Sequence, residues 1–464
     1  MASPNALTFK VTRKNTELIP PAKPTPHEFK PLSDIDDQEG LRFQLPLIAF
    51  FPKNPAMDRK DPVKVFRDAL AKALVFYYPF AGRLRETAGR KLVVECTGEG
   101  ALFIEADADV GLQQFGDTLQ PPFPCLEELL YDVPGSGGMV NCPLLLIQVT
   151  RLKCGGFIFA FRANHTMSDG FGLFQFASTM AELARGAEIP SVLPVWQRHL
   201  VSARDPPHVS YMHDEYENIP DAKETLIPLE NMVQRSFFFG PGEISALRRH
   251  LSPHLRRCTT FELLAACIWR CRTIAISPDP NEEVRILCFV NGRRLFNPLL
   301  PAGYYGNVVA TPLAISTAEN LCKQPLNFAL ELVMKAKSKV TEDYIKSVAN
   351  LMIIRGRPHF AVDMRTYIVS DLTHVASDNL DYGWGAPVFG GPAKGGAGVI
   401  PGLLSFHIPI KNIKGERGKL VPICLPANAM EVFVKELETM VKRDDDTDLG
   451  DAPKSSIFKG RTRL

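Results

Sequence analysis

Apolar residues along the chain change between short continuous runs and helical spacing. Residues 157–164, Phe-Ile-Phe-Ala-Phe-Arg-Ala-Asn, form a short, mostly apolar run that is typical of a buried strand. A similar run covers 144–149, and the Cys-Gly-Gly segment at 154–156 indicates a hairpin between the two runs. In residues 171–183 the apolar positions recur at helical spacing, and Gly186 follows as a C-terminal cap. The pattern predicts two paired strands followed at once by a helix.

Strands and helices alternate in both halves of the chain in the same way. Asp61 and Pro62 have the cap and first-turn chemistry of a helix start, and Thr259 and Glu262 have capping-box spacing. This alternation predicts an α/β protein. The further elements that we expect are helices at 61–79, 259–272 and 430–441 and strands at 91–95, 101–105, 285–290 and 366–369, with a turn joining 91–95 to 101–105.

The length of the chain, 464 residues, is too great for one ordinary core. A polar segment rich in proline interrupts the alternation near the middle, as a connection between two domains would. We therefore expect an N-terminal domain at 1–189, a crossover linker at 190–228, a C-terminal domain at 229–442 and a disordered tail at 443–464.

Charge and composition exclude several classes of partner. The formal net charge is +2 and no long basic run is present, so we expect binding neither to nucleic acid nor to a membrane surface. No apolar stretch approaches about 18 residues, and the N-terminus lacks the apolar core of a signal peptide, which predicts a cytoplasmic protein that does not insert into membranes. The ten cysteines are interpreted as reduced core thiols, and Cys267 and Cys271 have no histidine at metal-ligand spacing, so no metal site is expected.

The predicted strand and helix are joined by a segment that carries candidate chemistry, His165-Thr166-Met167-Ser168-Asp169-Gly170. Neutral imidazole can take a proton from an alcohol or thiol at cellular pH and later return it. Asp169 could hold the imidazole of His165 directly, or it could turn away and fix the loop through an arginine. The alternative without catalysis is a polar histidine that is satisfied at the end of a strand.

A second unusual segment, Asp381-Tyr382-Gly383-Trp384-Gly385, precedes a glycine-rich stretch at 390–398 whose spacing is not that of a phosphate-binding loop. Taken alone, it indicates two turns in which Trp384 is a hydrophobic anchor and Asp381 a local cap. Together, H-x-x-x-D near one-third of the chain and D-F-G-W-G near its end are the paired signatures of the plant BAHD acyl-CoA-dependent acyltransferases. The chain resembles this family over nearly its whole length, with Tyr382 in place of Phe.

The resemblance implies a two-domain fold like that of chloramphenicol acetyltransferase, with mixed sheets and an active-site channel between the domains. Acyl-CoA would enter this channel from one face as a co-substrate, a small-molecule alcohol would enter from the other, and no cofactor or metal would be bound permanently. His165 would deprotonate the alcohol, and Asp169 would pair with Arg293 in a geometric role. Trp384 would donate its indole N–H to the developing oxyanion if it faces the channel.

Other residues take weaker assignments from the same resemblance. Arg293, Asp381, Gly383 and Gly385 are expected to be structural, whereas Thr259, Thr260, Ser370 and Asp371 resemble segments near the coenzyme A channel. Segments 32–38, 122–125 and 141–145 look most like the alcohol acyltransferase branch. This branch implies benzoyl transfer from benzoyl-CoA to benzyl alcohol, with acetyl transfer to aliphatic alcohols or anthraniloyl transfer to methanol as alternatives. We expect a monomer.

Two functions from other classes remain open. One is a catalytically silent binding protein on the same fold, and the other is a hydrolase in which His165 activates Ser168, although the chain lacks a G-x-S-x-G elbow. The location also has an alternative, because Thr462-Arg463-Leu464 is close to the S-K-L type of peroxisomal signal.

Overall fold

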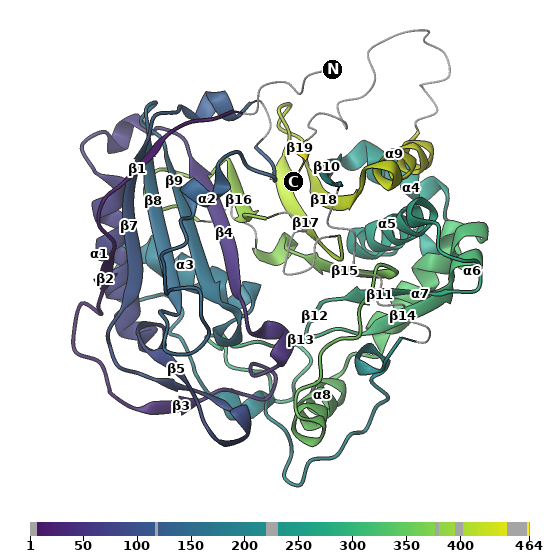
Figure 1. Ribbon diagram of the computed structural model, residues 1–464, viewed down its shortest axis with the longest axis horizontal. Coiled ribbons are helices and arrows are strands. Elements are labelled where there is room, and N and C mark those ends of the chain that lie inside the picture. Colours follow the sequence, from purple (N-terminus) through teal and green to yellow (C-terminus); the bar gives the residue numbers. More distant parts are fainter. Residues whose placement is uncertain are drawn as a thin grey trace.

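Two seven-stranded mixed sheets form the framework of the protein (Figure 1). The computed structural model describes residues 7–116, 119–219, 231–375, 380–394, 402–442 and 462–463. The first sheet has the order β1-β7-β8-β9-β4-β16, with β2 also paired to β7. Its strands are β1 (Val11–Arg13), β2 (Glu17–Ile19), β4 (Gln44–Phe51), β7 (Ala101–Ala108), β8 (Leu145–Leu152), β9 (Phe157–Asn164) and β16 (Phe389–Pro392).

The second sheet, in the order β14-β11-β15-β17-β18-β10-β19, is built from the second half of the chain. Its strands are β10 (Met232–Phe239), β11 (Glu283–Cys288), β14 (Leu313–Thr317), β15 (Thr366–Asp371), β17 (Leu404–Lys411), β18 (Arg417–Pro426) and β19 (Thr462–Arg463). Two smaller sheets consist of β3 (Phe29–Pro31), β6 (Leu92–Glu95) and β5 (Arg83–Glu86), and of β12 (Val290–Asn291) with β13 (Val309–Ala310).

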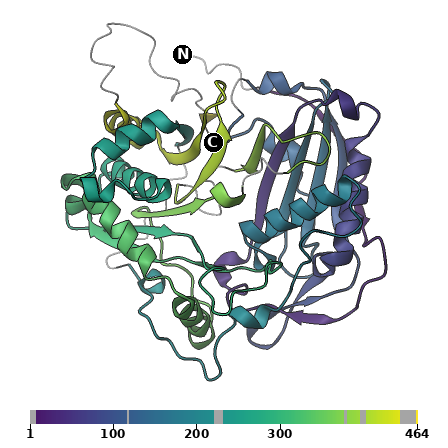
Figure 2. The same ribbon diagram turned by 180° about the vertical axis from the view of Figure 1, so that it is seen from behind.

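Helices α1 (Pro62–Phe76) and α3 (Gly170–Ala184) lie together on one face of the first sheet (Figure 2). Asp61 caps α1 as predicted, because its side chain accepts from the N–H of Val63. The helix ends at Phe76, three residues before the expected Pro79, because residues 78–81 tighten into a 3-10 turn. Short α2 (Leu126–Leu129) also belongs to this half.

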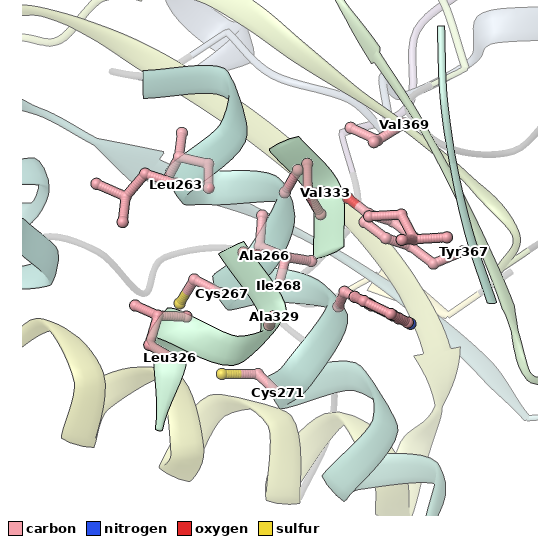
Figure 3. Packing of buried hydrophobic residues seen from close by; sticks show 14 of the residues in the cluster. Leu263, Ala266, Cys267, Ile268, Cys271, Leu326, Ala329, Val333, Tyr367 and Val369 are labelled. Atoms are coloured by element: carbon pink, nitrogen blue, oxygen red, sulfur yellow. The ribbon is translucent and has the colours of Figure 1, made fainter. Parts of the chain in front are cut away.

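The core of the second half forms around α5 (Thr260–Ile276), whose predicted capping box is present. Figure 3 shows residues of α5 between α7 and β15, with Cys267 and Cys271 inside this apolar cluster. The remaining helices are α4 (Pro241–Arg249), α6 (Ala318–Lys323), α7 (Leu326–Ser338), α8 (Glu342–Arg355) and α9 (Ala427–Val441).

The strands predicted at 91–95 and 101–105 are present as β6 and β7, but the two strands do not pair with each other. Strand β6 belongs to the small sheet, whereas β7 pairs with β8 in the first large sheet. A second departure concerns β16, which lies in the second half of the sequence yet pairs with β4 of the first sheet. The predicted linker at 190–228 divides the sequence into two parts and does not account for the pairing of β16 with β4. The domain boundaries themselves stay a prediction.

The expected tail at 443–464 falls almost entirely outside the described residues. Thr462 and Arg463 are described, and they pair with Gln234 and Val233 as β19, so disorder is the wrong expectation for these two residues. Across the described parts of the chain, no helix combines the length and apolar character needed to cross a membrane.

Candidate active site

The turn after β9 presents His165 at the junction of the two halves. Asn164 caps this turn, because its side-chain oxygen accepts from the N–H of Thr166 at 3.1 Å. The backbone N–H of His165 donates to the carbonyl of Phe43 at 2.9 Å, and the two rings lie 5.1 Å apart. His165 is partly exposed while its Nδ1 is buried, which leaves Nε2 as the ring nitrogen open to an incoming group.

Asp169 turns away from His165 and joins the two halves of the protein. Arg293 donates to both of its carboxylate oxygens, at 2.7 and 2.8 Å. The backbone N–H groups of Gly172 and Val308 donate to the same carboxylate at 3.0 and 3.1 Å. Of the two roles left open by the sequence, the structure therefore contains the pair with arginine.

Local structure explains why these groups meet. Asp169 is the N-cap of α3, so its carboxylate is held at the start of the helix. The ribbon of β12 and β13 brings together Arg293, two residues after β12, and Val308, one residue before β13. Gly172 is required in this first turn, because a Cβ there would lie 2.1 Å from the carbonyl oxygen of Tyr305.

The pKa values of Asp169 and His165 are shifted for different physical reasons. Burial by itself raises the pKa of Asp169, but Arg293 and the two backbone donors lower it below its ordinary value. Burial lowers the pKa of His165, against the opposing effects of its own backbone carbonyl, Asp169, the side chain of Asn307 and Asp36. At neutral pH the site thus holds a neutral imidazole beside an ionised, fully paired carboxylate.

A buried polar network beneath His165 was not assigned any role from the sequence. Asn307, 1% exposed, donates from Nδ2 to the carbonyl oxygen of His165 and to Oδ1 of Asp36, both at 2.9 Å. Asp36 in turn pairs with Arg198 at 3.0 Å, and Arg198 also donates to the carbonyl of Met167 at 2.8 Å. No sequence pattern joins Asp36 to Arg198, 162 residues later.

Ser168 cannot serve as the nucleophile of a hydrolase in this geometry. Its hydroxyl is buried and donates to the carbonyl oxygen of Tyr305 at 2.5 Å. Nδ1 of His165 has no hydrogen-bond partner, so the imidazole does not contact this hydroxyl through that nitrogen. The hydrolase alternative thus lacks an activated serine.

The structure contradicts the expectation that Trp384 faces the site. Trp384 is 5% exposed and packs edge-on against Phe157, with the ring centroids 5.1 Å apart. Phe157 begins β9 and His165 follows its end, so a rise of about 3.3 Å per residue separates them by roughly 25 Å. Trp384 is therefore a hydrophobic anchor in the first core and lies too far away to bind an oxyanion.

Asp381 has the local structural contacts that the sequence suggested. Its Oδ1 accepts from the backbone N–H of Gly383 at 2.7 Å and of Gly385 at 2.8 Å. Both glycines have positive φ, at 111° and 86°, which residues with a Cβ rarely adopt. Asp381 thus closes the tight turn that directs Trp384 into the core.

The predicted coenzyme A segments lie in the second half and approach each other through two rings. Phe261, next to 259–260, has its ring 5.3 Å from that of His407, and His407 is the cross-strand neighbour of Asp371 in residues 370–371. The carboxylate of Asp371 accepts from Lys419 at 3.0 Å.

The sequence model described as the Transferase family matches residues 9–440. The chain belongs to this family. The BAHD resemblance drawn from the two motifs is thereby confirmed, since both motifs lie within the matched residues.

Within the Transferase family, the chain is 65% identical over 442 residues to a benzyl alcohol O-benzoyltransferase of Petunia hybrida, covering 95% of this chain and 96% of the relative. It is 57% identical over 439 residues to a (Z)-3-hexen-1-ol acetyltransferase of Arabidopsis thaliana, with 93% and 95% covered. The crystal structure of vinorine synthase superposes with a TM-score of 0.69 at 21% identity over 93% of this chain and 98% of that one, which confirms the predicted two-domain mixed α/β fold.

Proposed function

We propose that the chain transfers an acyl group from acyl-CoA to the hydroxyl of a small alcohol, with benzoyl-CoA as donor and benzyl alcohol as acceptor. The observation that carries the choice of substrates is the 65% identity to a benzyl alcohol O-benzoyltransferase over 95% of the chain. Acetyl transfer is the second candidate, supported by the 57% identity to a (Z)-3-hexen-1-ol acetyltransferase.

The site supports direct transfer through His165. Its neutral imidazole, with Nε2 open, would take the hydroxyl proton while the alkoxide oxygen attacks the thioester carbonyl. The tetrahedral intermediate would then release coenzyme A as a thiolate, which takes the proton back from Nε2. Asp169 and Arg293 would hold the turn and would not exchange protons. We also propose that the substrates meet in a channel between the domains. Coenzyme A would contact four residues of the second half, Thr259, Thr260, Ser370 and Asp371.

The test is an activity matrix on the purified full-length chain. Benzoyl-CoA, acetyl-CoA and anthraniloyl-CoA are each combined with benzyl alcohol, hexenol and methanol, and thiol release is followed with and without alcohol. We expect the highest kcat/KM for benzoyl-CoA with benzyl alcohol, and thiol release only when alcohol is present. A preference for acetyl-CoA would support the second candidate, thiol release without alcohol would indicate hydrolysis, and no release with any pair would indicate a silent binding protein.

We further propose that the chain acts as a monomer in the cytosol, with peroxisomal import through Thr462-Arg463-Leu464 as the alternative. Leu464 lies outside the described residues, and the pairing of Thr462 and Arg463 with β10 would compete with a receptor for the tail. Two fluorescent fusions, one to the last ten residues and one to the full chain, test whether the tail directs peroxisomal import. In both, the native C-terminus is left free. Diffuse signal from both would exclude import by this tail.

A further inference from the structure

Two buried polar atoms without partners belong to residues that already contact each other. Nδ1 of His165 and Oδ1 of Asn307 are both buried, and neither has a hydrogen-bond partner of ordinary geometry. Nδ2 of Asn307 donates to the carbonyl oxygen of His165 at 2.9 Å, so Oδ1 on the same amide lies beside the residue that carries Nδ1. Buried polar atoms without partners are rare, because each loses its hydration without compensation.

The orientation of the Asn307 amide follows from its surroundings. Nδ2 faces two acceptors, the carbonyl of His165 and Oδ1 of Asp36, each at 2.9 Å. Rotating the amide by half a turn would place its oxygen against both of them and would lose both hydrogen bonds. Asp36 is itself fixed by Arg198 at 3.0 Å and by the backbone N–H of Asn307 at 2.8 Å. Oδ1 is therefore the atom that remains free to accept.

We propose that Oδ1 of Asn307 accepts the Nδ1 proton of His165 and so holds the neutral imidazole in the tautomer whose Nε2 is unprotonated. A neutral imidazole has one donor and one acceptor nitrogen, and an amide oxygen can only accept. The backbone carbonyl of His165, which also acts on its imidazole, can likewise only accept a hydrogen bond. Asn307 is thus a positioning residue, and this role rests on the proposed function of His165 as the base.

The ionisation of His165 agrees with acceptors near its ring. Burial lowers the pKa of His165, whereas its own carbonyl and the side chain of Asn307 act in the opposite direction, as acceptors that stabilise an N–H do. During transfer the alcohol O–H bond breaks and its proton moves to Nε2, while the oxygen electron pair forms the bond to the thioester carbon. The C–S bond then breaks and the thiolate takes the proton from Nε2. The proton on Nδ1 stays on His165 throughout and is donated in a hydrogen bond to Oδ1 of Asn307.

The direct test measures the tautomer of His165 in the wild-type protein. Full-length protein labelled with ¹⁵N-histidine is examined by NMR above the pKa of His165, and the signals of His165 are assigned by their loss in His165→Gln. We expect Nδ1 to have the chemical shift of a protonated nitrogen and Nε2 that of an unprotonated one. A proton on Nε2 in the wild-type protein would overturn the proposal, even if His165 proves to be the base.

Kinetics of Asn307→Leu give a second readout. We expect kcat to fall roughly tenfold or more with KM nearly unchanged, and the acid limb of kcat/KM to move to lower pH, because the imidazolium loses an acceptor. Asn350→Leu is the matched control, since Asn350 is equally buried and its side chain also makes two hydrogen bonds, accepting from the backbone N–H of Arg204 and donating to the carbonyl of His208. An unchanged acid limb in a folded Asn307→Leu protein would count against the role of Asn307.

Discussion

His165 differs from its buried neighbours because part of its ring is open, so its removal should leave the core intact. We expect His165→Ala to lower kcat by roughly 10²–10⁴-fold, the usual contribution of a positioned general base. The free energy of unfolding should change by less than about 1 kcal/mol. Thiol release at saturating substrate and urea unfolding measure the two quantities. Turnover close to that of the wild-type enzyme would exclude His165 as the base.

His407 is a second histidine with unusual surroundings, and it should make the fold sensitive to acid. Both ring nitrogens are buried without partners, and burial lowers the pKa of His407 to about 4 although Asp371 opposes this effect. In the unfolded chain the pKa of a histidine is about 6.5. Below this pH the unfolded chain therefore binds a proton at His407, whereas the folded protein does not until the pH approaches 4. The stability linked to this group is present above pH 6.5 and is lost as the pH falls toward 4.

We therefore expect His407→Phe to remove this sensitivity. Near pH 5, where wild-type His407 costs about 2 kcal/mol, the variant should lose less stability relative to neutral pH than the wild-type protein does. Urea unfolding at the two pH values measures the difference. His254→Phe is the control, because the side chain of His254 is 72% exposed. An equal loss of stability in wild-type and His407→Phe proteins would contradict the argument.

Groups whose chemistry is local are predictable from the sequence, whereas groups defined by distant contacts are not. His165 was found because its residue type, its place at a strand end and Asp169 four positions later lie within one short segment. The pairing of Asp36 with Arg198 joins positions 162 apart, and nothing in either neighbourhood indicates the other. Trp384 was placed wrongly because a motif gives a residue type but not the direction of its side chain.

Among the elements, α3 depends on a cap that also joins the two halves. Asp169→Asn should lower the free energy of unfolding by about 3 kcal/mol, because it leaves the buried charge of Arg293 without a partner. Activity should fall as well, since the turn carrying His165 loses its anchor. The matched control is Asp61→Asn at the cap of α1, where the partly exposed pair with Arg151 contributes about 0.5 kcal/mol. Equal effects of the two substitutions on stability would argue against the bridging role.

Element type was predictable because it depends on local periodicity and caps. The strand ending at Asn164, the cap at Asp61 and the capping box at Thr259 all appear as expected. Pairing was not predictable, because hydrogen bonds between strands join distant segments. The pairing of β16 with β4, more than 300 residues apart, left no periodic signal in the sequence.

At the scale of the whole molecule, the turn of 381–385 fastens the second half of the sequence into the first core. Trp384→Ala should lower the free energy of unfolding by about 3–5 kcal/mol, as loss of a buried aromatic side chain does. The kcat of the protein that remains folded should stay within about twofold, whereas loss of an oxyanion donor would cost roughly 10²–10³-fold. Active-site titration beside urea unfolding separates the two cases, and a fall in kcat of the second size would restore Trp384 to the site.

The two halves should also unfold together, because β16 comes from the second half of the sequence and pairs with β4 of the first sheet. Trp269 is buried in the core of the second half, whereas Trp384 comes from the second half of the sequence but lies in the first core. Variants that keep only one of these tryptophans, with Phe at the other positions, make fluorescence report one core at a time. Far-ultraviolet circular dichroism reports both cores in the same sample.

In each variant we expect fluorescence and circular dichroism to give one urea midpoint. The first sheet cannot keep β16 and Trp384 once the second half unfolds, and the buried pair of Asp169 with Arg293 breaks at the same time. Comparison within one protein removes any effect of the Phe substitutions on absolute stability. Separate midpoints for the two signals would show that each half is stable alone and that the exchanged strand contributes little to their coupling.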